Sequence, residues 1–544
     1  MVGEERNEVI LMPDEKDVVG KTAQELAKEQ REISVSEFFE KNRHLLGYDN
    51  LTRALLTVVK ELVDNSLDAA EESRVLPRVW IEIKPNGSDK FRVMVKDNGP
   101  GMVDKQIPLA LGKLLYGSKF FRLRQSRGQQ GVGGSGAILY SQLTTGKATN
   151  IISSTGDGKT SYYELMIDVK KNEPEIISHR IIEDGKLWHG LKIEIEVEGR
   201  YIESKQSIPE YIKQVAICNP FADIVFDGPN GRMEFPRGAN ELPPLPKEIM
   251  PHPHGVELGI FRRMLKATKA RTIASFLTND FSRIGTGTAK EVCKMAGIDP
   301  KISPKRVEIA DSEKIFKALQ KAKLMRPPLD CLSPLGEDLL IKGLKKEFNA
   351  EFYSAITRPP EVYRGNPFQV ECGIAYGGEI SPDSQVKLLR VSNRVPLLYQ
   401  EGDCAITKAV VSTDWKRYGL QQSGRSTPTG PAVILIHFSS VWVPFISESK
   451  QAIAAYPNIM KEIKLALQEL GRRLQHHVSG KRRIEMQQRR REIFDRYLPE
   501  VANAVAKLTN KKPEPILNKL MSIIKKSTEV VVDEGSKEEV GNTG

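Results

Sequence analysis

The stretch KELVDNSLDAAEES, Lys60 to Ser73, lies inside a longer run of helical periodicity. The apolar residues that build its stripe are Leu51, Leu55, Val58, Val59, Leu62 and Leu67. Glu61, Asn65 and Asp68 are four and then three residues apart, so they share another face of the same helix. This face is either an ordinary solvated surface or a site with a general base and a metal ligand one turn apart.

The composition is typical of a globular chain with several domains. The 544 residues are 40% hydrophobic, and the net charge of +11 suits a nucleic-acid partner. No apolar run is long enough to span a bilayer, and the opening MVGEERNEV is too charged for a signal peptide. The five cysteines are far apart and form no CxxC pair, which predicts a reducing cytoplasm and neither a zinc knuckle nor a disulfide framework.

Changes of periodicity divide the chain. Between residues 78 and 199, the segments RVWIEIK, FRVMVKD, ATNIISS, TSYYELMID and LKIEIEVEG are typical of strands, which predicts a sheet with one wetted face. The first two alternate polar and apolar residues and flank the hairpin signal PNG. Two Pro-rich joints bracket a set of short helices, and a region of strands and helices ends in a long helix from Ser449 to about Tyr497. The expected divisions are an N-terminal extension (1–40), an α/β domain (41–240), a helical domain (250–325), a strand-rich domain with the long helix (326–500) and a partly disordered tail (501–544).

Two further segments carry residues suited to ligand binding. In VMVKDNGPGM a strand delivers Asp97, and Gly99 and Gly101 bracket a tight turn; an ordinary Asn-Gly turn explains this piece equally well. In SRGQQGVGGSGAILYSQ, a glycine-rich loop leads into a helix, which can present N–H groups to phosphate. A P-loop is excluded, because both GKT triplets lack the glycine five positions earlier.

Taken in order, the helix, the strand end and the glycine loop resemble the GHKL ATPases, which include DNA gyrase, MutL and histidine kinases. The resemblance implies that Glu61 activates water, that Asn65 holds Mg²⁺ against ATP, and that Asp97 reads the adenine amino group. Gly99 and Gly101 would shape the turn around this aspartate. The loop residues that would close over the phosphates are Gly128, Gln129, Gln130, Gly131, Val132, Gly133, Gly134 and Ser135.

Residues 30–500 are also similar to the B subunits of DNA topoisomerase VI, through LGKLLYGSKFF, the helical middle region and VPFISESKQAIA. This resemblance implies an α+β multidomain fold: a GHKL (Bergerat) ATPase α/β sandwich, a helix-two-turns-helix domain, and a ribosomal-protein-S5-like transducer with a long C-terminal helix. It implies that Ser118 and Lys119 approach the nucleotide from a lid and that Lys450 reaches the γ-phosphate. We expect Lys450 at the start of the long helix, where a cation is unfavourable unless an anion neutralises it.

One residue departs from the family pattern. GHKL proteins usually carry Gly-Thr near the last strand of the ATPase domain, where the threonine helps to bind adenine. The corresponding stretch here is HGLKIEIEV, with Leu191 in place of the threonine. Either the adenine pocket lacks one hydroxyl or the true counterpart lies elsewhere.

The sequence TDWKRYG matches a Trp-Lys-x-Tyr signature of these B subunits, which makes Trp415, Lys416 and Arg417 candidates for DNA contact. Lys416 and Arg417 can neutralise phosphates, whereas Trp415 can instead anchor the segment. Basic runs in the long helix and in the helical domain are further candidates, or solvated faces. No tyrosine and no Asp-x-Asp motif indicates a strand-cleaving site.

The resemblance therefore implies an ATP- and Mg²⁺-dependent subunit that relaxes supercoiled DNA by double-strand passage with a separate, DNA-cleaving A subunit. The implied partners are this A subunit in an A2B2 heterotetramer, duplex DNA, and a second copy of the chain on ATP binding. Two alternatives remain open: an Hsp90- or MutL-like ATP-dependent clamp without topoisomerase activity, and a histidine kinase.

Overall fold

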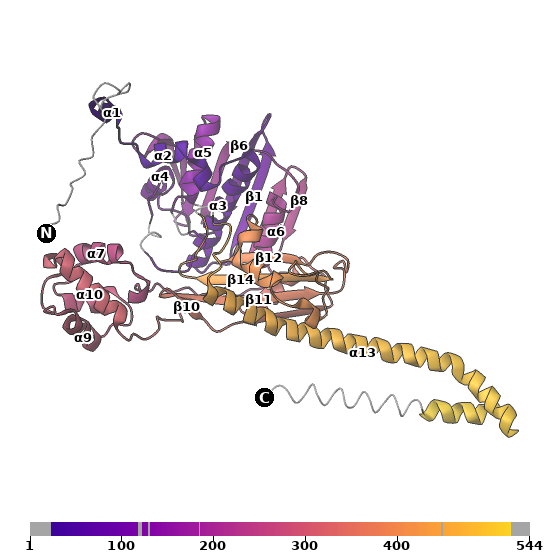
Figure 1. Cartoon of the computed structure of the whole chain (residues 1–544). Coiled ribbons are helices and arrows are strands. Elements are labelled where there is room, and N and C mark those ends of the chain that lie inside the picture. Colours follow the sequence, from indigo (N-terminus) through magenta and orange to yellow (C-terminus); the bar gives the residue numbers. More distant parts are fainter. Residues whose placement is uncertain are drawn as a thin grey trace, which may run out of the picture.

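The structure is a computed structural model that describes residues 23–523 except 118–121, 129–130, 184, 186 and 448–449. Two sheets lie one above the other, a group of short helices lies beside the second sheet, and one long helix projects away from the body (Figure 1). In the described part of the chain, no helix is both long enough and apolar enough to cross a membrane.

The first sheet has eight strands in the order β5-β4-β3-β6-β2-β1-β7-β8. They are β1 (Arg78–Pro85), β2 (Lys90–Asp97), β3 (Thr149–Thr155), β4 (Lys159–Asp168), β5 (Glu173–Glu183), β6 (His189–Glu198), β7 (Asp223–Gly228) and β8 (Gly231–Phe235). The antiparallel hairpin of β1 and β2 confirms the turn prediction, and alternating burial along both strands confirms a half-wetted sheet. Strands β5, β7 and β8 were not predicted.

Helices cover the apolar face of the first sheet. They are α2 (Val35–Lys41), α3 (Leu51–Glu72), α4 (Ile107–Gly112), α5 (Gly133–Thr145) and α6 (Ile208–Cys218), with α1 (Ala23–Glu29) preceding them. Helix α3 begins where the Asn50 side chain accepts the N–H of Arg53 at 2.9 Å, an N-cap bond. Of its predicted stripe, Leu55, Val58, Val59, Leu62 and Leu67 are buried in one core with the strands, whereas Leu51 is only partly buried. Each fully buried leucine or valine contributes about 1.5–3 kcal/mol.

Four short helices form a separate lobe within residues 250–325, the range predicted for the helical domain. They are α7 (Leu258–Ala267), α8 (Ile273–Asp280), α9 (Thr286–Ala296) and α10 (Ile309–Lys321). Phe261 is fully buried at the centre, where its ring contacts Phe276, Phe281 and Phe316. This core contains no residue of either sheet.

The second sheet is buried on both faces. Its strands are β9 (Phe352–Thr357), β10 (Glu361–Tyr363), β11 (Asn366–Tyr376), β12 (Lys387–Ser392), β13 (Val395–Pro396) and β14 (Ala432–Ser440). Helices α12 (Ala405–Val411) and α13 (Pro457–Thr509) share a core with one face. Helix α11 (Glu337–Lys345) and the end of α6 cover the other face, which explains why every residue of β14 is buried.

The long helix differs from its prediction at both ends. Helix α13 has 53 residues and begins at Pro457, a residue that suits the first helical position. Lys450 therefore lies in the loop before the helix and not at its start, so the helix-dipole argument for this lysine is wrong. The helix continues through Pro499 and bends toward its far end (Figure 1). A further helical segment covers residues 513–523.

Candidate active site

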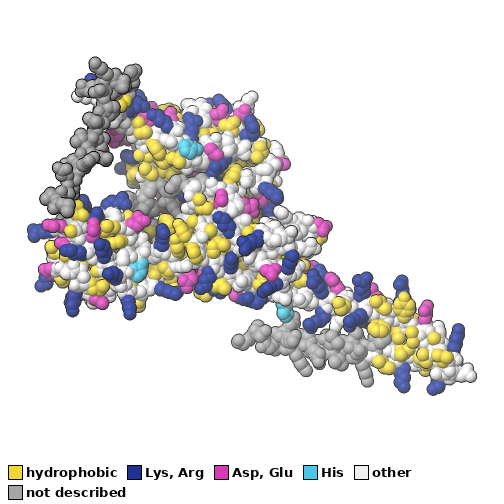
Figure 2. Space-filling view, in the orientation of Figure 1, with side chains coloured by type: hydrophobic (Ala, Val, Ile, Leu, Met, Phe, Trp, Pro, Cys, Tyr) yellow, Lys and Arg dark blue, Asp and Glu magenta, His cyan; other side chains and the backbone are white. Residues whose placement is uncertain are grey.

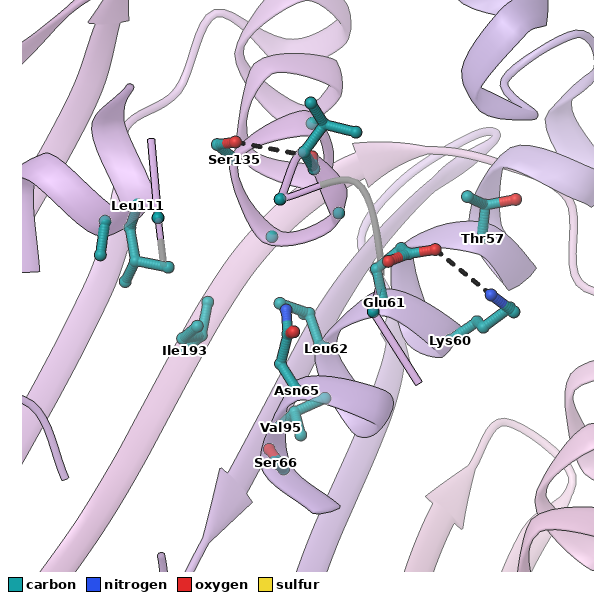
Figure 3. A pocket seen from close by; sticks show the side chains of 18 of the residues that line it. Thr57, Lys60, Glu61, Leu62, Asn65, Ser66, Val95, Leu111, Ser135 and Ile193 are labelled. Atoms are coloured by element: carbon teal, nitrogen blue, oxygen red, sulfur yellow. Dashed lines mark hydrogen bonds and ion pairs between the residues drawn. The ribbon is translucent and has the colours of Figure 1, made fainter. Parts of the chain in front are cut away.

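One cavity of about 310 Å³ brings together residues that are far apart in the sequence. Its walls come from α3, the end of β2, the start of β6, the glycine loop and the loop between β14 and α13. Figure 3 shows Glu61 and, one turn further along α3, the neighbouring residues Asn65 and Ser66, with Ser135 at the start of α5 opposite them. The predicted residues that line the cavity are Glu61, Asn65, Asp97, Gly101, Gly128, Gly131, Val132, Gly133, Gly134, Ser135 and Lys450.

Glu61 lies at the mouth of the glycine loop and beside a buried lysine. Lys60 Nζ is 3.3 Å from Glu61 Oε1 (Figure 3). The same Nζ is 3.5 Å from Asp64 Oδ2. Burial lowers the pKa of Lys60, but the two carboxylates outweigh this and raise it, so the lysine stays charged. Glu61 thus has a fixed cation on one side and the loop backbone on the other, which restricts where its carboxylate can point.

Asn65 is exposed to the cavity one turn after Glu61. Its Nδ2 lies beside Gly134, where an added Cβ would be 3.2 Å away. Among the described residues, no group of three or more His, Cys, Asp or Glu side chains could hold a metal. A lone carboxamide oxygen beside a phosphate-binding loop fits Mg²⁺, which keeps several waters and takes few protein ligands.

Asp97 is fixed by backbone donors at the end of β2. Its Oδ1 accepts the N–H of Gly99 at 2.9 Å and the N–H of Leu191 at 3.1 Å. Burial raises the pKa of Asp97, while these donors and the Ser66 hydroxyl oppose the rise. Gly101 has φ +70°, and a Cβ there would be 2.0 Å from the Ser154 carbonyl oxygen, so only glycine fits the turn.

The glycine loop leads directly into α5. Among the described residues, no side chain caps this helix, whose first residues are Gly133, Gly134 and Ser135. All three residues line the cavity, so the N-terminal end of the helix, which is the positive end of its dipole, lies at the cavity wall. This is the arrangement that binds phosphate oxygens. Ser135 Oγ makes a long contact of 3.5 Å with the Val132 carbonyl oxygen.

Lys450 reaches the same cavity from the second sheet. It follows β14, has φ +54°, and lies next to Gln451, whose Oε1 accepts the N–H of Tyr399 at 3.3 Å. The buried carboxamide of Gln451 holds the loop against the sheet. A cation from one domain and a glycine loop from another therefore face one space.

Several predicted residues do not line the cavity. Gly99 lies behind Asp97 and shapes its turn. Ser118, Lys119, Gln129 and Gln130 lie outside the described residues.

The Trp-Lys-x-Tyr segment lies away from the cavity, on a short 3-10 turn (Trp415–Tyr418). Trp415 is fully buried and its Nε1–H donates to the Val410 carbonyl oxygen at 2.9 Å. The indole therefore anchors the segment, which is the second of the two roles that the sequence suggests for Trp415, and it offers no exposed surface to DNA. Lys416 and Arg417 are exposed, and Arg417 pairs with Asp414 at 2.9 Å.

Sequence reasoning missed several cavity residues. Thr57, Lys60 and Ala69 line it, and Thr57, Glu61, Asn65 and Ala69 are each four residues apart. This spacing places the four residues on one helix face, and it is a signal from which Thr57 and Ala69 could have been predicted. The other missed lining residues are Leu46, Gly47, Tyr48, Arg53, Leu62, Ser66, Val95, Met102, Ala110, Leu111, Tyr116, Gly117, Gly136, Ile193 and Gln451. Leu191 also lines the cavity, at the position expected when HGLKIEIEV is aligned with the Gly-Thr stretch of GHKL proteins.

Two family models match the chain. Residues 53–187 match the model described as histidine kinase-, DNA gyrase B-, and HSP90-like ATPase. Residues 327–490 match the topoisomerase VI B subunit transducer. The first match covers most of the first sheet with its cavity, and the second covers the second sheet and most of the long helix.

Whole-chain relatives give the same result. The chain is 47% identical to the type 2 DNA topoisomerase 6 B subunit of Methanosarcina barkeri over 92% of this chain and 81% of that protein. It is 40% identical to the protein of the same name from Pyrococcus furiosus, over 95% and 99% of the two chains. A solved structure, the ATPase region of Saccharomyces cerevisiae topoisomerase II bound to ICRF-187, aligns at TM-score 0.40 and 11% identity over 82% and 100%. The chain therefore belongs to the family of topoisomerase VI B subunits, the ATPase subunits of type IIB DNA topoisomerases.

Proposed function

We propose that the chain binds Mg-ATP in the cavity between α3 and the glycine loop, hydrolyses it, and uses it to drive double-strand passage through DNA. One observation carries this proposal. Glu61, Asn65, Asp97 and Lys450 line the same cavity, and the N-terminus of α5 forms part of its wall. Each supplies a different chemical function, and none is explained by the packing of the core.

Glu61 is the proposed general base. A carboxylate that is held by Lys60 and the loop backbone can take a proton from a water placed between it and the phosphates. Asn65 would hold Mg²⁺, which supplies charge neutralisation on the phosphate oxygens. The N–H groups at the start of α5 would bind the same oxygens, and Lys450 would reach the terminal phosphate.

Asp97 would orient the base of the nucleotide. Two backbone N–H groups hold its Oδ1, so the carboxylate is fixed and its other oxygen can accept a hydrogen bond from a ligand; apolar residues that also line the cavity include Met102, Leu191 and Ile193. An exocyclic amino group is a donor, so adenine fits beside this carboxylate. Leu191 places a methyl-bearing side chain where a threonine hydroxyl is usual, so we infer that adenine recognition relies on Asp97 and the Ser66 hydroxyl beside it.

In the proposed division, three buried cores lie mainly within one unit each, and a fourth is shared between the first unit and the last. We assign an ATPase domain to residues 41–240, a helix-two-turns-helix domain to 250–325 and an S5-like transducer with its long helix to 326–500. ATP would bring two copies together and work as a gate beside a DNA-cleaving A subunit in an A2B2 assembly. A closed dimer requires that ATP binds this state better than the open monomer.

Two substitutions test the roles in the ATP site. Glu61→Ala should leave nucleotide affinity nearly intact and remove hydrolysis, because a base acts only in the transition state. Asn65→Ala should weaken Mg-ATP binding itself. Wild-type hydrolysis by Glu61→Ala would contradict the assignment of the base.

A sizing experiment tests the gate. A saturating non-hydrolysable ATP analogue should convert the chain from monomer to dimer, and the Lys450→Ala variant should need a higher analogue concentration. A chain that stays monomeric at saturation would contradict ATP-driven dimerisation while leaving the hydrolysis assignment intact. Relaxation of supercoiled DNA by the chain with its A subunit completes the test.

A further inference from the structure

The segment 122–128, which leads into the glycine loop, is held by groups from outside the first sheet. Gln125 forms two hydrogen bonds with the backbone of Ser333, its Nε2–H donating at 3.1 Å and its Oε1 accepting at 2.8 Å. The Ser126 carbonyl oxygen accepts the Nδ2–H of Asn393 at 3.0 Å. Ser333 and Asn393 both belong to the part of the chain that matches the transducer model.

Arg127 joins this segment to the helix that carries Glu61. Its Nη1 donates to Asp68 Oδ1 at 2.8 Å, and its Nη2 donates to Glu71 Oε1 and to Asn219 Oδ1. Glu71 is also bound from the second sheet, because its Oε2 is 3.1 Å from Nη2 of Arg394. One carboxylate on the last turn of α3 is thus shared between the approach to the glycine loop and the transducer.

This ion network is almost completely buried. The side chains of Arg127 and Arg394 are 1% and 5% exposed, and that of Glu71 is 11% exposed. Two guanidinium groups face two carboxylates, so the charges balance. Removing one member of such a buried network leaves an unpaired charge, whereas the complete network fixes a single geometry.

The turn that supplies Arg394 is itself rigid. Asn393 and Arg394 have φ values of +46° and +66°, which non-glycine residues rarely adopt. The Arg394 N–H donates to Nε2 of the buried His437 at 3.0 Å, and Asn393 Oδ1 accepts the Ser440 N–H at 2.9 Å. A strained turn persists only when its surroundings over-determine it, so these bonds tie it firmly to β14.

We propose that Asn393 and Arg394 are positioning residues for ATP hydrolysis: through Ser126 and Glu71 they set the glycine loop relative to α3. The proposal rests on the proposed ATPase function of the cavity and adds a second link between transducer and nucleotide, independent of Lys450. Neither residue lines the cavity, so any effect on the reaction must pass through the 122–128 segment and Glu71.

The expected kinetic signature follows from when the loop acts. The placement of the N–H groups at the start of α5 against the phosphates matters most in the transition state, where small misplacements reduce the rate strongly. A loosened loop should therefore lower kcat for ATP and change KM little. A role in fold stability alone would lower the melting temperature and leave kcat unchanged in the folded protein.

The decisive variant is Asn393→Gly in the full chain. Glycine keeps the left-handed backbone but removes the bonds to Ser126 and Ser440. We expect kcat to fall about tenfold and KM to change less than about threefold, measured well below the melting temperature. Asp89→Gly is the matched control: it also has φ +54°, lies in the β1–β2 turn, and should hydrolyse ATP at the wild-type rate.

Arg394→Lys and Arg394→Met provide a second measurement. Lysine keeps the charge that pairs with Glu71, so Arg394→Lys should retain more of kcat than Arg394→Met. Lysine cannot contact Glu71 and Ser333 together, so Arg394→Lys should still have a lower kcat than the wild type. A kcat within twofold of wild type for both Asn393→Gly and Arg394→Lys would overturn the proposal. The proposed function has its own test in Glu61→Ala. If the wild type hydrolyses ATP and Glu61→Ala does not, the proposed function stands even where the Asn393 and Arg394 variants overturn the positioning role. Hydrolysis by Glu61→Ala would contradict the proposed function.

Discussion

Gly133 lies so close to Glu61 that a Cβ atom on the glycine would be 1.9 Å from Oε2 of the carboxylate. The glycine loop and the proposed base therefore fit only while residue 133 has no side chain. The nearest atom is the end of a flexible side chain, so the fold can absorb a methyl group by moving the carboxylate away.

Gly133→Ala should therefore abolish hydrolysis without unfolding the protein. We expect kcat to fall about 100-fold, because a displacement of about 1 Å at a reacting group costs that much. Binding of a non-hydrolysable analogue, followed by fluorescence, should persist. Gly287→Ala is the control, since a Cβ there meets nothing within 4 Å. Normal turnover by Gly133→Ala would show that Glu61 does not act from this position.

Lys416 should contact DNA through phosphate alone. It is exposed beside the buried Trp415, and nothing in the segment suggests base reading. In the assembly with the A subunit, Lys416→Ala should weaken binding about equally on two unrelated duplexes and lower the salt slope by roughly one unit. Lys159→Ala, at the start of β4 in the other sheet, is the control. An unchanged slope would place the DNA path elsewhere, for example along the cations of α13 (Figure 2).

We expect Glu371 to make the free energy of unfolding depend on pH in the acid range. Burial raises its pKa, but His437 and the backbone N–H groups of Leu335 and Gly336 outweigh this and hold it below the ordinary value of 4.5. Its stabilising contribution is therefore complete above about pH 4.5 and is lost as the pH falls through the folded pKa. Glu371→Gln should cost about 1–3 kcal/mol at neutral pH. Urea titrations should show this difference shrinking below pH 4.5; a constant difference would contradict it.

Two glycines of α13 should respond in opposite directions to alanine. At Gly471 a Cβ would be 2.4 Å from the Tyr418 ring, whereas at Gly480 it meets nothing within 4 Å. Gly480→Ala should stabilise the helix by about 0.5–1 kcal/mol. Gly471→Ala should destabilise by about 1–3 kcal/mol, because overpacking outweighs the gain in helix propensity. Thermal unfolding measures both, and equal shifts would mean that Tyr418 moves aside freely.

The elements that periodicity predicted are those with one buried face. Helix α3 and the β1–β2 hairpin alternate clearly between buried and exposed positions, and their sequences alternate between apolar and polar residues with the same period. Strand β5 was missed because it is exposed along nearly its whole length, which leaves no alternation to detect. The long helix was predicted too early, although Pro457 marks its true first turn.

Residues of the candidate site could be predicted where they lie close together in the sequence. Glu61 and Asn65 are one turn apart, and the glycine loop is continuous in sequence. Arg394 was not predictable, because its pairing with Glu71 joins residues more than 300 positions apart and no short motif records it. Membership of the topoisomerase VI B family decides against the histidine-kinase alternative and the Hsp90- or MutL-like clamp.

The end of α6 gives the two sheets a common interior. Ile217 and Phe221 pack with Leu344 of α11 and Val433 of β14, and a Cβ on Gly343 would be 2.1 Å from the Ile217 carbonyl oxygen. The sheets are therefore one cooperative unit of folding, although they match separate family models. A fragment that stops at residue 240 leaves this apolar patch in water, whereas the helical lobe around Phe261 keeps a complete interior of its own.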